Sequence, residues 1–307
     1  MIAFSTSDKG GTGRSVTSSN MLYQAALRGL NVCYLDFDFG SPTSGAIFGI
    51  DAYGRGTTSE RGLHEYFQGS VSEPETVSIW DASDRNSIRN RPAGTGRMVL
   101  VPGDAGAGEF SGPFTIMADR CRRLLRWASS EFDLTIVDLS AGRSFALQLA
   151  LAVTGGPDPV VPLSRWMVFH RWTMQHVVAA HGLVYGEQGI LDTGIKLGHD
   201  KETLLDRVRF VRTAIIDPNA PDLAGLRPPQ LTWLSERNTE LHQRAGELQL
   251  GRTMTLGEVP LDPIFQWHEQ LLTDSDLYGR NVANKVTVDR IEELSRRLLD
   301  DDAWERL

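Results

Sequence analysis

No other part of this chain constrains its fold as strongly as residues 7–16, which read Ser-Asp-Lys-Gly-Gly-Thr-Gly-Arg-Ser-Val. A short apolar run at 2–4 precedes them, and apolar residues at helical spacing follow at 16–30. A strand, a glycine-rich turn and a helix in this order gather backbone N–H groups and the positive helix end at one point, where they bind phosphate. These residues therefore predict a phosphate-binding loop, although a glycine-rich turn with scattered charges would have the same composition.

Two later stretches carry acidic residues where a buried strand is expected to end. The apolar segment 31–38 ends in Asp36 and Asp38, and the segment 132–139 delivers Asp138. Ligands of open α/β sheets lie beyond the carboxyl ends of the strands, so these carboxylates are expected at the same edge as the loop. The Ser15 hydroxyl and the Asp138 carboxylate are oxygen groups of the kind that bind Mg²⁺. The alternative is a set of solvated strand ends.

Residues 9–15, Lys-Gly-Gly-Thr-Gly-Arg-Ser, resemble a known motif. It is the deviant Walker A motif, Lys-Gly-Gly-x-Gly-Lys-[Ser/Thr], of the ParA/MinD family of dimeric P-loop ATPases (SIMIBI class). Arg14 stands where the family has its phosphate lysine, as in variant-loop members of the actinobacterial type. The segment 36–45 resembles the family's switch I, and 138–142, Asp-Leu-Ser-Ala-Gly, resembles its Walker B and switch II segment. The resemblance covers nearly the whole chain in the family's order.

The resemblance implies a nucleotide site with ATP or ADP and Mg²⁺ as cofactors. The residues expected to bind the nucleotide are Gly10, Gly11, Thr12, Gly13, Arg14, Ser15 and Val16, with Arg212 and Pro260 near the base. The ligands expected for Mg²⁺ are Ser15, Asp36 and Asp138. Three residues are implied to act in hydrolysis: Lys9 would reach the partner subunit's nucleotide, Arg14 would clamp the β- and γ-phosphates, and Asp38 would orient the attacking water.

The implied architecture is α/β, with a doubly wound, mostly parallel sheet of seven or eight strands and helices on both faces. One domain over 1–307 is expected, with a variable loop region at 51–96, an insertion near 185–201 and a C-terminal helix and tail at 286–307. Further strands are expected at 97–101, 159–163, 207–215 and 253–258, and helices at 114–129 and 230–248. A helix carrying Trp166, Phe169, Trp172 and Val177 is expected after the strand at 159–163.

Composition limits the partners and the compartment. With 41% hydrophobic and 23% charged residues among 307, the chain has the make-up of a soluble globular protein. A net charge of −8 argues against a generally basic nucleic-acid binder, so DNA is possible but not indicated. The arginines at 120–126 are interpreted as a solvated helix face, the alternative being a basic patch. The chain has no apolar run of 18 residues and no signal peptide, and its tail is acidic, so we expect a cytoplasmic protein without membrane attachment. We expect the two cysteines to be reduced core residues.

Two functions are compatible with these residues. The first is a nucleotide-switched homodimer with weak or partner-dependent ATP hydrolysis, which acts with an activating or cargo protein in partitioning or positioning DNA or a cellular cargo. The second is a catalytically inactive relative that serves as a scaffold and binds nucleotide without turnover, or binds none. Lys9 and Asp38 favour the first. Arg14 favours the second, because a planar guanidinium is bulkier than the compact ammonium group of lysine.

Overall fold

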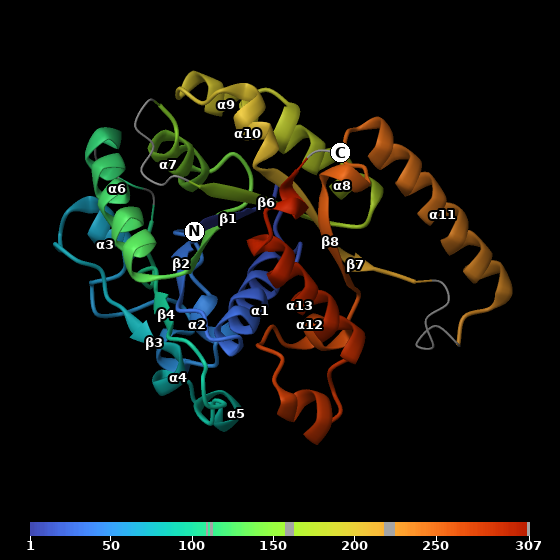
Figure 1. The fold of residues 1–307 in the computed structure, drawn as a ribbon, viewed down its shortest axis with the longest axis horizontal. Coiled ribbons are helices and arrows are strands. Elements are labelled where there is room, and N and C mark those ends of the chain that lie inside the picture. Colours follow the sequence, from blue (N-terminus) through green and yellow to red (C-terminus); the bar gives the residue numbers. More distant parts are fainter. Residues whose placement is uncertain (109, 111–112, 157–162, 218–224, 306–307) are drawn as a thin grey trace.

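An eight-stranded sheet forms the centre of the molecule, in the order β3-β4-β2-β5-β1-β6-β7-β8 (Figure 1). The computed structural model describes residues 1–108, 110, 113–156, 163–217 and 225–305. Neighbouring strands are parallel except for the antiparallel pair of β3 and β4. The strands are β1 (Ile2–Thr6), β2 (Val32–Phe37), β3 (Val77–Ser78), β4 (Met98–Val101), β5 (Leu134–Leu139), β6 (Ser164–Arg171), β7 (Val208–Ile215) and β8 (Thr255–Pro260).

Helices cover both faces of the sheet, as expected for a doubly wound fold (Figure 1). Helices α6, α7 and α8 pack on one face, and α1 and α13 pack on the other. The helices are α1 (Arg14–Leu27), α2 (Ser44–Ile47), α3 (Leu63–Gln68), α4 (Ile79–Ala82), α5 (Asn86–Arg89), α6 (Phe114–Glu131), α7 (Phe145–Thr154), α8 (Met174–Tyr185), α9 (Ile190–Lys196), α10 (Lys201–Asp206), α11 (Pro228–Glu247), α12 (Pro263–Trp267) and α13 (Lys285–Leu299).

The central strands are buried on both sides, which explains their nearly continuous apolar sequences. In β2, Cys33 and Leu35 belong to the core beneath one helical layer, and Val32 and Tyr34 belong to the core beneath the other. Cys33 and Cys121 are both buried free thiols, as predicted. No helix within the described residues is both long and apolar enough to cross a membrane.

The C-terminal segment, from Leu298 to Trp304, packs on the domain near the first residues of β6 and β7. Arg165 on β6 is buried and donates hydrogen bonds to the Leu298 carbonyl and to Asp301. Arg209 on β7 is buried and donates to the carbonyl of Trp304, whose ring lies 4.9 and 5.4 Å from the two guanidinium carbons. These contacts satisfy two buried cations that would otherwise destabilise the sheet.

One prediction of secondary structure is wrong. Trp166 and Phe169, assigned to a helix, lie in strand β6, and the helix that follows begins only at Met174. Aromatic residues at 166, 169 and 172 imitate helical spacing, but β6 is a central strand buried on both faces, so its hydrophobic pattern has no clear period. Of the strand expected at 159–163, residues 159–162 lie outside the described part of the chain.

The regions outside the core pattern contain more helix than expected. The segment 51–96, expected as a variable loop region, contains the short helices α3, α4 and α5. Helix α9 lies within 185–201, the segment expected to be an insertion. On α6, Arg120 donates to the carbonyls of Tyr66 and Val71, so that arginine holds a neighbouring segment.

Candidate functional site

The phosphate loop lies at the carboxyl edge of the sheet, between β1 and α1. Gly11 and Gly13 have positive φ angles of 69° and 73°, a conformation that glycine adopts at little cost. Gly13 directly precedes the first turn of α1, so the N–H groups of that turn face the loop. The Thr213 hydroxyl on β7 donates to the Thr12 carbonyl over 2.6 Å, and this bond fixes the loop against the sheet.

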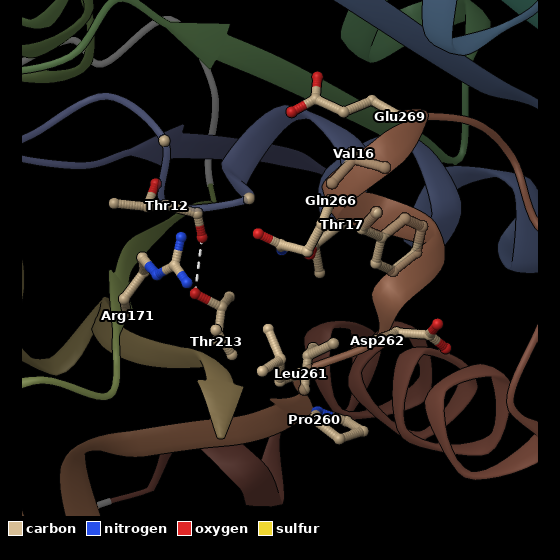
Figure 2. A pocket seen from close by; sticks show the side chains of 15 residues that line it. Thr12, Val16, Thr17, Arg171, Thr213, Pro260, Leu261, Asp262, Gln266 and Glu269 are labelled. Carbon is tan, nitrogen blue, oxygen red and sulfur yellow. Dashed lines mark hydrogen bonds between the residues drawn. The ribbon is translucent and has the colours of Figure 1, made fainter. Parts of the chain in front are cut away.

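A pocket opens directly beside this loop (Figure 2). Three parts of the chain form its wall: the loop with the start of α1, the ends of β6 and β7, and the segment 259–269. Figure 2 shows Arg171, the last residue of β6, beside Thr12 and Thr213, with Pro260 and Leu261 nearby. The lining residues are Gly11, Thr12, Gly13, Val16, Thr17, Arg171, Thr213, Ala214, Val259, Pro260, Leu261, Asp262, Phe265, Gln266 and Glu269.

Arg14 is buried beside the carboxylates of the neighbouring strands and does not line this pocket. Its Nε lies 2.5 Å from Oδ1 of Asp138, and its Nη2 lies 3.2 Å from Oδ2 of Asp38 and 3.3 Å from the Ser15 hydroxyl. The contact with Asp138 is a close, buried ion pair. Burial would lower the pKa of Arg14, but the charges of Asp138 and Asp38 outweigh it and raise that pKa.

Asp138 and Asp36 also accept hydrogen bonds from neighbouring groups. Tyr34 donates its hydroxyl to Oδ2 of Asp138 over 2.8 Å. Asp36 accepts a 2.6 Å hydrogen bond from the Ser44 hydroxyl and a second bond from the Ser44 N–H. Burial, with the nearby charges of Asp138 and Asp38, raises the pKa of Asp36 to about 7 against these bonds. We call Asp36, Asp38 and Asp138 the acidic cluster, and two of its members, Asp38 and Asp138, pair with one internal cation, Arg14.

The residues named for Mg²⁺ do not fit that ion in this arrangement. Mg²⁺ requires near-octahedral oxygen ligands at about 2.0–2.1 Å and usually keeps several waters. The guanidinium of Arg14 contacts two of the candidate ligands, Ser15 and Asp138, and the third, Asp36, is bound to Ser44. A divalent ion placed among them would lie against a buried positive charge, so Arg14 would have to leave first.

Lys9, in contrast, is exposed together with the two glycines that follow it. Its neighbour Asp8 forms an ion pair with Arg143, 3.2 Å away, and Arg143 also donates to the Gly182 carbonyl on α8. The N–H of Gly142 donates to the Ser7 carbonyl over 2.7 Å. The start of the phosphate loop is therefore joined to the segment after β5, while the Lys9 side chain is left available at the surface.

The two residues expected near the base of the nucleotide, Arg212 and Pro260, differ in whether they reach the pocket. Pro260 lines the pocket, whereas Arg212 does not. Arg212 is buried, forms a 2.8 Å ion pair with Glu258, donates to the Leu250 carbonyl and stacks over the Trp172 ring.

Sequence reasoning missed several of the pocket residues. Arg171 contributes a cation from the end of β6, and no carboxylate within the described residues pairs with it. Ala214 holds a left-handed conformation with φ of 52°, beside the irregular register between β7 and β8. The sequence did offer one signal, a basic residue at the end of a strand. It was not recognised for Arg171, because the strand was expected at 159–163 and not at Ser164–Arg171.

Comparison with known proteins gives a clear result for the fold. No protein-family model and no curated protein sequence matches the chain. Among solved structures, MinD in the MinC:MinD cell division complex of Aquifex aeolicus has a TM-score of 0.61 at 15% identity over 97% of this chain and 95% of that one. A ParA of pNOB8 bound to nonspecific DNA has 0.57 at 11% identity, covering 97% and 98%. MinD of Pyrococcus horikoshii complexed with Mg-ADP has 0.52 at 13% identity, covering 97% and 96%. The chain therefore has the P-loop fold found in MinD and ParA proteins.

Proposed function

We propose that this chain is a nucleotide-dependent switch of the ParA/MinD type, which binds ATP or ADP at its phosphate loop. The pocket of Figure 2 carries the proposal, because it combines backbone N–H groups at the start of α1 with the Arg171 guanidinium. Backbone donors and a nearby cation are the groups that bind phosphates most strongly. The fold shared with MinD bound to Mg-ADP supports the same ligand class.

We infer a place for each part of the nucleotide from the residues that line the pocket. The phosphates would lie on the N–H groups of residues 10–16, and Arg171 would contact them from β6. The base would pack near Pro260 and Phe265, which provide the apolar part of the wall. Asn20 on α1 supports that wall, since it donates to the Gln270 carbonyl over 2.9 Å and accepts from the Leu272 N–H over 2.7 Å.

The nucleotide would control association of two copies. Lys9 is exposed at the rim of the loop, where it can reach a nucleotide bound by a second subunit. Asp38 is partly exposed and would orient the attacking water, although its ion pair with Arg14 favours slow hydrolysis without an activating partner. A cargo or activating protein, or DNA, would bind the assembled dimer, which would act in partitioning or positioning. The MinD and ParA neighbours were solved with MinC and with nonspecific DNA.

We expect wild-type protein to bind ATP in isothermal titration calorimetry, and Arg171→Gln to weaken that binding by about tenfold or more. A hydrogen bond to a charged group contributes about 1.5–3 kcal/mol, and the substitution removes the charge that faces the phosphates. Arg126→Gln, on the exposed face of α6, is the matched control and should leave the affinity unchanged. Absence of ATP binding by the wild type at saturating nucleotide would contradict the proposed function.

We expect ATP to increase the mass of the wild-type protein in light scattering, from that of one chain toward that of two. Lys9→Ala should abolish this shift while leaving ATP affinity nearly intact, because an exposed lysine contributes little to its own subunit's loop. Lys196→Ala removes another exposed lysine, on α9, and serves as the control. An ATP-linked shift that persists in Lys9→Ala would exclude the role of this residue across the interface.

A second candidate function is a scaffold that binds nucleotide without turnover, or binds none. The ion pairs of Arg14 with Asp38 and Asp138 favour it, since they occupy the groups assigned to water activation and to the metal. The two functions differ in turnover, which a phosphate-release assay measures directly. Steady release of phosphate by the wild type, alone or with an activating protein, would exclude the scaffold.

A further inference from the structure

Two carboxylates of the acidic cluster, Asp38 and Asp138, pair with a cationic side chain of the protein itself. Arg14 brings one positive charge to a point between β2 and β5, where Asp38 and Asp138 end. Its guanidinium lies 2.5 Å from the Asp138 carboxylate, 3.2 Å from the Asp38 carboxylate and 3.3 Å from the Ser15 hydroxyl. A guanidinium is a planar fork with five donors and can therefore bridge groups that a single ammonium cannot contact together.

We propose that Arg14 is the permanent cation of this site, where it occupies two of the groups expected to bind Mg²⁺, the Ser15 hydroxyl and the Asp138 carboxylate. The chain then binds ATP without Mg²⁺. This inference deepens the proposed function, and the part that concerns ATP rests on it. Bound phosphates would otherwise lie next to an acidic cluster with no positive charge to offset it, and Arg14 supplies that charge from within the fold.

Three features of the structure make this cation a fixed one. The side chain of Arg14 is 7% exposed, and that of Asp138 is 2% exposed, so water screens their attraction poorly. Tyr34 donates to the other oxygen of Asp138, Oδ2, which helps to keep the carboxylate in position for Arg14. Arg14 is also the first residue of α1 and has little freedom to move its backbone away from the cluster.

The phosphates need a second cation if Arg14 remains on the carboxylates. Arg171 meets that need, because it lines the pocket beside the loop and comes from a different strand. The two charges that a lysine and a metal ion supply in other phosphate loops would here come from two arginines. This division of roles explains how a loop with arginine at position 14 can still bind a nucleotide.

The first test compares ATP affinity in excess MgCl₂ and in excess EDTA by calorimetry. The wild type should bind with the same affinity in both, within about twofold, whereas Arg14→Lys should bind at least about tenfold more weakly in EDTA. Lysine frees one carboxylate for a metal, so its ATP affinity becomes dependent on Mg²⁺. Arg126→Gln should behave as the wild type does. A wild type that requires Mg²⁺ for ATP binding would overturn the inference and leave the proposed function standing.

The second test needs no nucleotide. Arg14→Gln leaves the acidic cluster without its cation, so MgCl₂ should raise the melting temperature of this variant above that in NaCl of equal ionic strength. The wild type should melt at the same temperature in both salts. Stabilisation of the wild type by MgCl₂, or no stabilisation of either Arg14→Gln or Arg14→Lys, would overturn the inference. If ATP binds in neither buffer, the proposed function fails, and the melting data alone decide the role of Arg14.

Discussion

Asp138→Asn is expected to lower the free energy of unfolding by about 3–5 kcal/mol, because it leaves the Arg14 guanidinium buried without its nearest countercharge. The substitution keeps the shape of the side chain and an oxygen that can accept from Tyr34, so the loss comes mainly from the charge. Urea unfolding at neutral pH, in the absence of nucleotide and divalent ions, measures this difference. The cost is a large fraction of the total stability of a typical domain.

Two further variants separate this effect from a general one. Asp289→Asn removes the carboxylate of an exposed ion pair with Lys285 on α13 and should leave stability unchanged. The double variant Asp138→Asn with Arg14→Gln removes the buried charge as well, so it should be more stable than Asp138→Asn alone. A loss in Asp138→Asn no larger than that in Asp289→Asn would show that the ion pair contributes nothing.

Arg14→Lys is expected to raise ATP turnover by about 100-fold over a slow wild type, since misplacing a catalytic group by about 1 Å costs on that order. In the wild type the guanidinium engages Asp38, the residue proposed to orient water. A lysine offers a single ammonium group that can turn toward the phosphates and release that carboxylate. Phosphate release in excess MgCl₂ measures the gain.

The control for this gain is the double variant Arg14→Lys with Asp38→Ala, which should return turnover to the wild-type level. Such a result would assign the gain to Asp38 and not to tighter nucleotide binding. A wild type that already hydrolyses ATP as fast as Arg14→Lys would contradict the expectation and remove the main support for the scaffold function.

The sequence was sufficient to predict most of the fold, because its strongest signals are local. The phosphate loop needs glycines at Gly11 and Gly13, where φ is positive, and both are visible in the sequence. The apolar strands that end in Asp36 and Asp138 were correctly placed, since parallel strands of this fold are buried on both faces. Strand β6 was misplaced for the same reason, because a strand buried on both faces has no alternation to distinguish it from a helix.

The details of the site depend on side-chain directions, which the sequence does not specify. Arg14 turns to Asp38 and Asp138 because the parallel strands bring residues 24 and 124 positions away to one edge of the sheet. Arg212 and Thr213 are neighbours in β7, but side chains alternate along a strand, so only Thr213 reaches the loop. The prediction named Arg212, one residue before Thr213, and the side chain of Arg212 therefore lies on the opposite face of the strand.

The two arginines at the base of the sheet impose an order on how the newly made chain reaches its native state. Arg165 and Arg209 enter the sheet with β6 and β7, but the C-terminal carbonyls that accept from them lie 133 and 95 positions later. Arg209 also donates to the nearby carbonyls of Asp206 and Val208. A ribosome-bound chain that has emerged only as far as β7 lacks the C-terminal partners of both arginines, so burying these guanidinium groups costs more free energy at that stage than in the complete chain. We therefore expect β6 and β7 to close onto the sheet late in translation, after α13 has been synthesised, because contacts so distant in the sequence form slowly.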